Sequence, residues 1–191
     1  MTSDDHVSDS PPALGTEQRV ENFNSEVSVP DPTKLPGDLA VVFDYWNDLR
    51  GDRLAPFWRE FDMMALPARS IPWCAVVDVV PTPVDFIYRF WGTGRAQLHG
   101  RDYTGLSVAT IEPAAVAEKV MAEYRHVFES NGPIHAVTIE IGEEPDAAYR
   151  YDSLRLPLSS ESADIGHVFA INEYGNSRNA YHRLFGTDPP L

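Results

Sequence analysis

The stretch from Asp85 to Gly105 constrains the fold more than any other, because its pattern changes three times within 21 residues. Asp85 to Trp91 alternates aromatic with other residues, which is typical of a strand. Gly92 to Gly94 interrupts this strand, and Arg95 to Leu98 has the length of one or two helical turns before the next glycine. Another break follows at Gly105. We expect these turns to make a concave surface, so function should lie in a pocket or an interface.

Hydrophobic periodicity predicts helices on both sides of this stretch. An apolar face runs along a helix expected over Asp38–Arg50, with Asp38 as its cap. A shorter helix is expected over Pro56–Ala65, and a long helix over Glu112–Asn131. The first two helices should pack against a sheet or against a second copy of the chain. Alternating or continuous apolar runs predict five strands: Trp73–Val80, Asp85–Trp91, Ile134–Ile141, Tyr149–Leu158 and Gly166–Tyr174.

The order of these elements shows no βαβ alternation, which argues against a dinucleotide-binding type of domain. We expect one antiparallel sheet with helices on one face, an α+β fold. The 191 residues suffice for one domain with additional segments. The expected division is a disordered acidic, proline-rich leader (1–37), flanking helices (38–66), the main domain (67–175) and a polar, aromatic tail (176–191).

The charge balance excludes some classes of partner. The chain carries 29 acidic residues against 15 Lys and Arg, a net charge of −14. Nucleic acid and anionic membranes both require a basic surface, so neither is expected as a partner. The first twelve residues lack the basic and apolar regions of a secretory signal, and no apolar run is long enough to span a membrane. We therefore expect a soluble cytoplasmic protein.

The one cysteine, Cys74, excludes a disulfide within the chain and is consistent with a reducing compartment. It lies in the apolar run Trp73–Val77, which favours a buried, inert thiol over a redox sensor.

No catalytic or metal signature stands out in the sequence. His126 lies on the long helix but points about 130° away from its apolar face, so haem ligation is disfavoured. His99 ends the short helix, where it either favours the helix dipole or contacts a ligand. An enzyme using His99, Arg101 and Asp102 remains an alternative. The acids between Glu140 and Asp146 are read as a solvated loop rather than a metal site.

Aromatic and apolar residues form either an ordinary core or the lining of a ligand pocket between the sheet and the short helices. By strand alternation, Phe86, Tyr88 and Phe90 share one face of their strand, with Trp91 on the other. The candidate pocket residues are Phe86, Tyr88, Phe90, His99, Tyr103, Val120, Tyr124, Phe128 and Phe169.

Four segments resemble the PAS domain, a bacterial sensory and interaction fold, and in particular small stand-alone PAS-like proteins. They are Leu66–Arg69, Tyr88–Thr93, His99–Gly105 and Leu156–Ser159. The element order is also similar: two strands, short helices, one long helix and three strands. The resemblance covers about residues 38–175. It implies a five-stranded antiparallel sheet with a helical face.

PAS domains bind haem, flavin or metabolites, or bind nothing and mediate dimerisation, so the resemblance leaves the cofactor unknown. The outward His126 departs from the haem type. The cysteine motif of the photoactive flavin type is missing from the short helices, since Cys74 lies in the first strand. Only 17 residues follow Tyr174, so we expect output through another protein.

The leading hypothesis is therefore a non-enzymatic sensory or regulatory module that acts through a homodimer or a separate signalling protein, with a small molecule as modulator. A structural subunit with a filled core is another alternative. The expected interaction surface is the apolar face of the first helix: Leu39, Val42, Phe43, Trp46 and Leu49.

Overall fold

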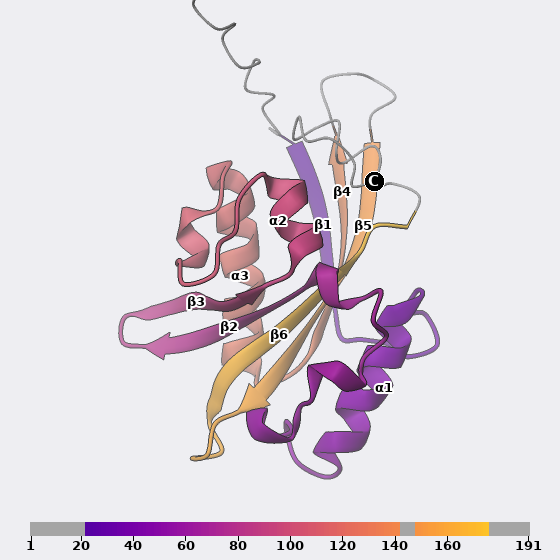
Figure 1. The fold of residues 1–191 in the computed structure, drawn as a ribbon, viewed down its shortest axis with the longest axis vertical. Coiled ribbons are helices and arrows are strands. Elements are labelled where there is room, and N and C mark those ends of the chain that lie inside the picture. Colours follow the sequence, from indigo (N-terminus) through magenta and orange to yellow (C-terminus); the bar gives the residue numbers. More distant parts are fainter. Residues whose placement is uncertain (1–21, 142–147, 176–191) are drawn as a thin grey trace, which may run out of the picture.

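The computed structural model describes residues 22–141 and 148–175, so the first part of the expected leader, the loop 142–147 and the tail 176–191 lie outside the described residues. The described chain forms one antiparallel sheet in the order β1-β4-β5-β6-β2-β3 (Figure 1). The strands are β1 (Asn22–Ser28), β2 (Cys74–Pro81), β3 (Val84–Trp91), β4 (Ile134–Ile141), β5 (Ala148–Ser159) and β6 (Ile165–Glu173).

Three α-helices and four 3₁₀ turns complete the described part of the chain. The α-helices are α1 (Asp38–Arg50), α2 (Thr93–His99) and α3 (Ala114–Ser130). The 3₁₀ turns are η1 (Trp58–Glu60), η2 (Met63–Ala65), η3 (Ile71–Trp73) and η4 (Val108–Thr110). Among the helices of the described ranges, none has the length and apolar character needed to cross a bilayer.

The sheet has six strands rather than the expected five. The additional strand is β1, which the sequence analysis placed in the leader, and it pairs with β4 along its whole length. Its sequence, Asn-Phe-Asn-Ser-Glu-Val-Ser, carries only two apolar side chains. The strand is therefore held by backbone pairing at the edge of the sheet, which leaves little hydrophobic alternation to detect.

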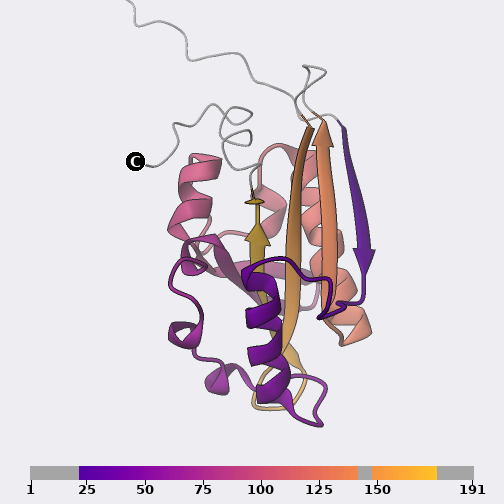
Figure 2. The ribbon, with the colours of Figure 1, turned by 90° about the vertical axis from the view of Figure 1, so that its right-hand side faces the viewer.

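Helices cover both faces of the sheet, whereas one covered face was expected. Figure 2 shows α1 in front of the sheet and α3 behind it. On the α1 face, the Trp46 indole donates to the carbonyl of Pro157 at 2.8 Å. On the α3 face, Arg155 of β5 pairs with Glu123 of α3. Arg155, which alternates with the leucines of β5, therefore points into a second packed layer.

A bulge in β3 reverses the facing expected for its last residues. Val77 pairs with Tyr88 and the preceding Val76 pairs with Phe90, so Arg89 is the extra residue. One extra residue moves everything beyond it to the opposite face. Trp91 consequently lies beside Tyr88, with ring centroids 4.6 Å apart, while Phe90 turns to the α1 face. The expected set Phe86, Tyr88 and Phe90 is wrong in its third member.

The N-terminal segment differs from expectation in two details. Pro56–Ala65 forms the turns η1 and η2 instead of one helix, because Phe57 and Asp62 adopt extended conformations before each turn. The cap of α1 is Gly37 rather than Asp38. The buried Asp38 carboxylate instead accepts hydrogen bonds from Arg69 and Ser70. The Leu66–Arg69 motif therefore helps to anchor the start of α1.

Candidate functional site

Five aromatic residues lie between the sheet and the helices α2 and α3. We call this set the aromatic cluster: Phe86, Tyr88, Trp91, Tyr103 and Tyr124, all of which are buried. The Phe86 and Tyr124 rings are 5.5 Å apart, and the Trp91 and Tyr103 rings are 5.2 Å apart. These distances are those of packed aromatic pairs, so the rings form part of the core as well as a candidate lining.

The other predicted pocket residues divide between the two faces. His99 contacts this cluster, with its ring 5.3 Å from that of Trp91. Val120 and Phe128 lie on α3 and pack against the core. Phe169 is buried on the opposite face, 4.9 Å from the Phe61 ring, because β6 alternates and Phe169 pairs with Val76. Phe90 and Phe169 therefore lie outside this candidate site.

Next to these rings lies a group of charged and amide side chains that we call the buried polar cluster: Arg95, Glu123, Arg155 and Asn172. Arg95 comes from α2, Glu123 from α3, and the other two from β5 and β6. Their relative exposures are 4%, 3%, 1% and 8%. Charged residues are rarely buried so completely, and those that are buried are normally paired.

Hydrogen bonds join the members of this polar cluster. Arg155 donates to Glu123 Oε2 through both Nε and Nη2, at 3.1 and 2.8 Å. Arg155 Nη1 and Arg95 Nη2 both donate to Asn172 Oδ1, at 3.1 and 2.8 Å. Arg95 Nε donates to the carbonyl of Trp73, which ties α2 to the start of β2. The cluster thus links α2, α3 and the centre of the sheet.

A third buried cation, Lys119, extends this network along α3. Lys119 donates to the hydroxyls of Thr138 and Tyr151, at 3.1 and 2.5 Å, and lies 3.6 Å from Glu123. Positive charge therefore gathers on this side of the sheet, although the chain as a whole is strongly acidic.

The pKa shifts report the same environment. Burial lowers the pKa of His99 to about 3, and the nearby charges of Arg95 and Lys119 add to this effect. Burial also raises the pKa of Tyr88 well above its ordinary value, against the opposing influence of Arg95 and Arg155. Burial acts to lower the pKa of Arg155, but Glu123, Tyr124 and Tyr88 raise it above its ordinary value. His99 is thus neutral and Arg155 charged at neutral pH.

Two buried polar atoms of the aromatic cluster lack a partner among the described residues. Trp91 Nε1 donates no hydrogen bond to any of them. The Tyr124 hydroxyl lies near that of Tyr88 but outside hydrogen-bonding geometry. Such atoms are uncommon in native interiors and often mark the place of a water or a ligand. Both atoms belong to residues beside the guanidinium groups of the polar cluster.

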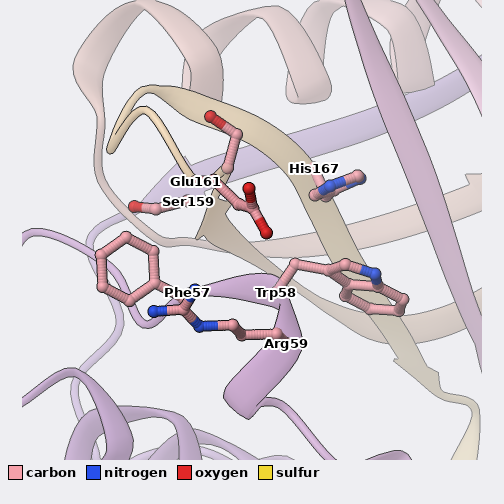
Figure 3. Close-up of a pocket in the computed structure, with 7 residues that line it drawn as sticks. Phe57, Trp58, Arg59, Ser159, Glu161 and His167 are labelled. Atoms are coloured by element: carbon pink, nitrogen blue, oxygen red, sulfur yellow. The ribbon is translucent and has the colours of Figure 1, made fainter.

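A separate hollow of about 220 Å³ opens on the α1 face of the sheet. Trp58 and His167 lie side by side on one side of it, and Phe57 lies on the other (Figure 3). His167 Nδ1 is 2.8 Å from Asp78, which also pairs with Arg89. His167 is thus engaged by Asp78, and the hollow presents aromatic, serine and charged side chains, with Arg59 and Glu161 among its lining residues.

The residues of the enzyme alternative do not converge. The His99 ring points toward Trp91 and Tyr103. Arg101 is exposed and lies over the outer ring face of Tyr103, 5.3 Å from its centroid. Asp102 is exposed and accepts a hydrogen bond from the Thr104 amide, which lowers its pKa. No common position for a reacting atom follows from these three side chains.

The apolar face of α1 is covered by the chain's own sheet. Leu39, Val42, Phe43 and Trp46 are all buried in the core, and Leu49 packs at its edge. The sequence correctly indicated one apolar face, but in this structure a partner could reach it only by displacing α1.

Two expectations about single residues are confirmed. His126 is exposed on α3, as its helical angle predicted. Cys74 is buried, its thiol donates to the Ser70 carbonyl, and burial raises its pKa to about 12.

Within residues 22–141 and 148–175, no group of three or more His, Cys, Asp or Glu side chains could hold a metal ion. Most of the acidic segment Glu140–Asp146 lies outside those ranges.

The order of the elements decides the type of fold. After β1 and α1 come two strands, the short helices α2 and η4, the long helix α3 and three strands. The fold is PAS-like. The two hairpin groups, β2-β3 and β4-β5-β6, meet through the β2–β6 pairing, and the helical segment between them lies on one face of the PAS-like sheet.

No protein-family model matches this chain, and no curated protein matches it. Among solved structures, an RNA-binding light-oxygen-voltage receptor is similar with a TM-score of 0.43 and 10% identity, over 86% of this chain and 42% of the receptor. A PAS domain from Colwellia psychrerythraea is similar with a TM-score of 0.40 and 16% identity, over 61% of this chain and 99% of that domain. Because both TM-scores are below 0.5, the PAS-like assignment depends on the order and pairing of this chain's own elements.

Sequence reasoning missed the buried polar cluster. Arg155 is one of the polar residues that alternate with Leu154, Leu156 and Leu158, and neither it nor Glu123 was singled out from the sequence. One signal in the sequence could have indicated them. The two predicted amphipathic helices each need an apolar surface to pack against, and a single sheet offers both only if each of its faces is covered. Both sides of β5 are then buried, including the side that carries its polar residues.

Proposed function

We propose that this protein is a PAS-like sensory or regulatory module that holds a small ligand between the sheet and the α2–α3 layer. Its output passes through a separate protein or a second copy of the chain. The observation that carries this proposal is the buried Arg95 beside Trp91 Nε1, which has no hydrogen-bond partner among the described residues. The hydrogen bonds of Arg95 to two neutral acceptors tie α2 to the sheet, but such a tie does not require a cation. A buried charge without an anion and a buried indole N–H without an acceptor are both costly, which favours a ligand over a purely structural role.

The position of Arg95 supports a regulatory role for the ligand. Arg95 lies on α2 and reaches both the Trp73 carbonyl and Asn172 of β6. A ligand that binds this guanidinium changes how firmly α2 is held against the sheet. Binding shifts a conformational equilibrium only when the ligand contacts the two states differently, and a contact to this anchoring group meets that requirement.

A filled-core structural subunit is the second candidate, and one observation favours it. The aromatic rings already contact one another at ordinary packing distances. In a structural subunit, the buried cations would serve only to connect α2 and α3 to the sheet. Its binding surface for other proteins would then be the same with or without a small molecule.

Amide hydrogen exchange separates these two candidates. The protein as purified is compared with protein that has been unfolded, dialysed and refolded, which removes a retained small molecule. We expect faster exchange in α2 and the segment to Gly105 after removal, with unchanged exchange in α1, and an altered oligomeric state or partner affinity. Identical exchange and identical assembly in both preparations would support the structural subunit.

A further inference from the structure

We propose that Arg95 is the recognition group for a small monocarboxylate whose apolar or aromatic body packs against the aromatic cluster. This inference rests on the proposed function and adds the chemical class of the ligand. It depends on the positive charge of Arg95, on N–H donors of Arg95 and Trp91 that have no acceptor among the described residues, and on the aromatic rings around them.

The first step is the charge of Arg95. Arg95 is 4% exposed, yet its two bonded guanidinium nitrogens donate to neutral acceptors, the Trp73 carbonyl and Asn172 Oδ1. No described residue places a carboxylate within ion-pair distance of it. A buried cation is ordinarily paired with an anion. Among the described residues, Arg95 therefore has no anionic partner, and a ligand anion at this position would neutralise its charge.

Arg155 provides the comparison within the same cluster. Its three guanidinium nitrogens all donate, two of them to the Glu123 carboxylate. Asn172 Oδ1 receives donors from Arg155, Arg95 and Ser153 at once. This single oxygen is overcommitted, and Nη1 of Arg95 makes no hydrogen bond to a described residue. A carboxylate would supply the acceptors that Asn172 alone cannot.

The second step is the neighbouring donor. The Arg95 guanidinium lies 5.2 Å from the centroid of the Trp91 ring, and Trp91 Nε1 is buried without a partner among the described residues. An indole N–H can only donate, so it requires an acceptor. One carboxylate group has acceptor positions for both the guanidinium and the indole.

The third step concerns the rest of the ligand. Tyr88, Trp91 and Tyr103 surround this position with ring surface. Glu123 carries a negative charge in the same cluster and opposes a second ligand charge. A single negative charge on an apolar body fits these surroundings better than phosphate or a dicarboxylate. Because the rings are in contact, such a ligand must move α2, the element that carries Arg95.

The test uses the full chain labelled with ¹⁵N and the indole N–H signals of its four tryptophans. Trp91→Phe identifies the Trp91 signal. The probes are benzoate and its uncharged analogue benzamide, with inorganic phosphate as a different anion, all at constant ionic strength. We expect benzoate to move the Trp91 signal saturably, and benzamide and phosphate to bind at least about tenfold more weakly.

Arg95→Met should weaken benzoate binding by about tenfold or more, while Arg125→Met, an exposed arginine on α3, should not change it. Should Arg95→Met fail to fold, Arg95→Lys keeps the charge but loses the planar fork, and the same loss is expected. Equal binding of benzoate and benzamide, equal affinity in the folded Arg95 variant, or no saturable shift would overturn the proposal. A retained ligand that is neutral would also overturn it, and would leave the proposed regulatory function standing.

Discussion

At the scale of single residues, buried charge is the unusual feature of this molecule. Glu123 and Arg155 pair inside the protein, with relative exposures of 3% and 1%. A buried pair contributes little net stability compared with an apolar replacement, but removal of one partner leaves the other charge without compensation. The two members therefore depend on each other.

Glu123→Gln should accordingly lower the free energy of unfolding by about 3–5 kcal/mol, because it leaves the Arg155 cation buried and unpaired. Glu118→Gln is the matched control, since Glu118 is exposed on the same helix and its loss should change stability by about 0.5 kcal/mol or less. Urea unfolding of the two variants measures the difference. A similar small effect for both would show that the Glu123–Arg155 pair is not a buried ion pair in solution.

His99 should make the protein sensitive to acid. Its pKa falls from the ordinary 6.5 to about 3 in the folded state, chiefly because of burial. The unfolded chain therefore binds more protons between these values, and stability is lost as the pH decreases through that window. His99→Gln should reduce the loss between about pH 6.5 and about pH 4. His126→Gln, at an exposed site, should leave the loss unchanged, and equal slopes for both variants would contradict the assignment.

At the scale of elements, the position of α1 determines which surface a partner can reach. Trp46→Ala should destabilise the protein by about 3–5 kcal/mol, because the indole is 1% exposed and bonded to Pro157. Val41→Ala, on the exposed side of α1, should change stability by about 0.5 kcal/mol or less. Thermal unfolding with light scattering compares them. A Trp46→Ala protein of unchanged stability but altered oligomeric state would restore the interface that the sequence predicted.

The turn between β3 and α2 requires glycine for a steric reason. A Cβ atom at Gly92 would lie 2.3 Å from the Pro72 carbonyl oxygen. Gly92→Ala should therefore destabilise the fold by about 1–3 kcal/mol or more through the shift that it forces on η3 or α2. Gly132→Ala is the control, because the nearest atom to its Cβ lies at 3.6 Å. The denaturant midpoints of the Gly92→Ala and Gly132→Ala variants measure the two effects. Equal midpoints would contradict the close approach of α2 to η3.

The elements also show where prediction from the sequence succeeds. α3 was predicted because Val116, Val120, Tyr124 and Val127 repeat at helical spacing on one buried face. The β2–β3 hairpin followed equally from its apolar alternation around a proline turn. β1 was missed because an edge strand with two apolar residues has no such pattern. The bulge at Arg89 was missed because it arises from the pairing of β3 with β2. Phe90 and Trp91 were therefore predicted on the wrong faces of the sheet.

The candidate site was predicted in part, for a physical reason that concerns the whole sheet. Tyr88, His99, Tyr103 and Tyr124 lie together beside α2 and α3, and their role as pocket residues stays a prediction. Buried Arg155 was not foreseen, since a polar residue in an alternating strand ordinarily faces water. Arg95 and Lys119 were not foreseen because a cation on a helix is ordinarily exposed. Only the presence of packed layers on both faces of the sheet turns such residues inward.

At the scale of the whole molecule, the sheet separates two layers with different roles. The α1 layer is mainly apolar and completes the core on one face, with the buried Asp38 carboxylate at the start of its helix. The α2–α3 layer contributes Arg95, Lys119 and Glu123, and Arg95 and Glu123 are joined to β6 and β5 by hydrogen bonds. We expect a signal that begins in the second layer to reach the surface through α2. This expectation depends on a ligand being present there.

Native mass spectrometry of the full chain, purified without added ligands, tests this central claim most directly. The account predicts a mass above that of the 191-residue chain, lost on denaturation and absent from a folded Arg95→Met variant. The Arg125→Met control should retain the additional mass. A wild-type spectrum showing only the bare chain, in a protein that also fails to bind benzoate, would contradict the claim that this layer is a ligand site.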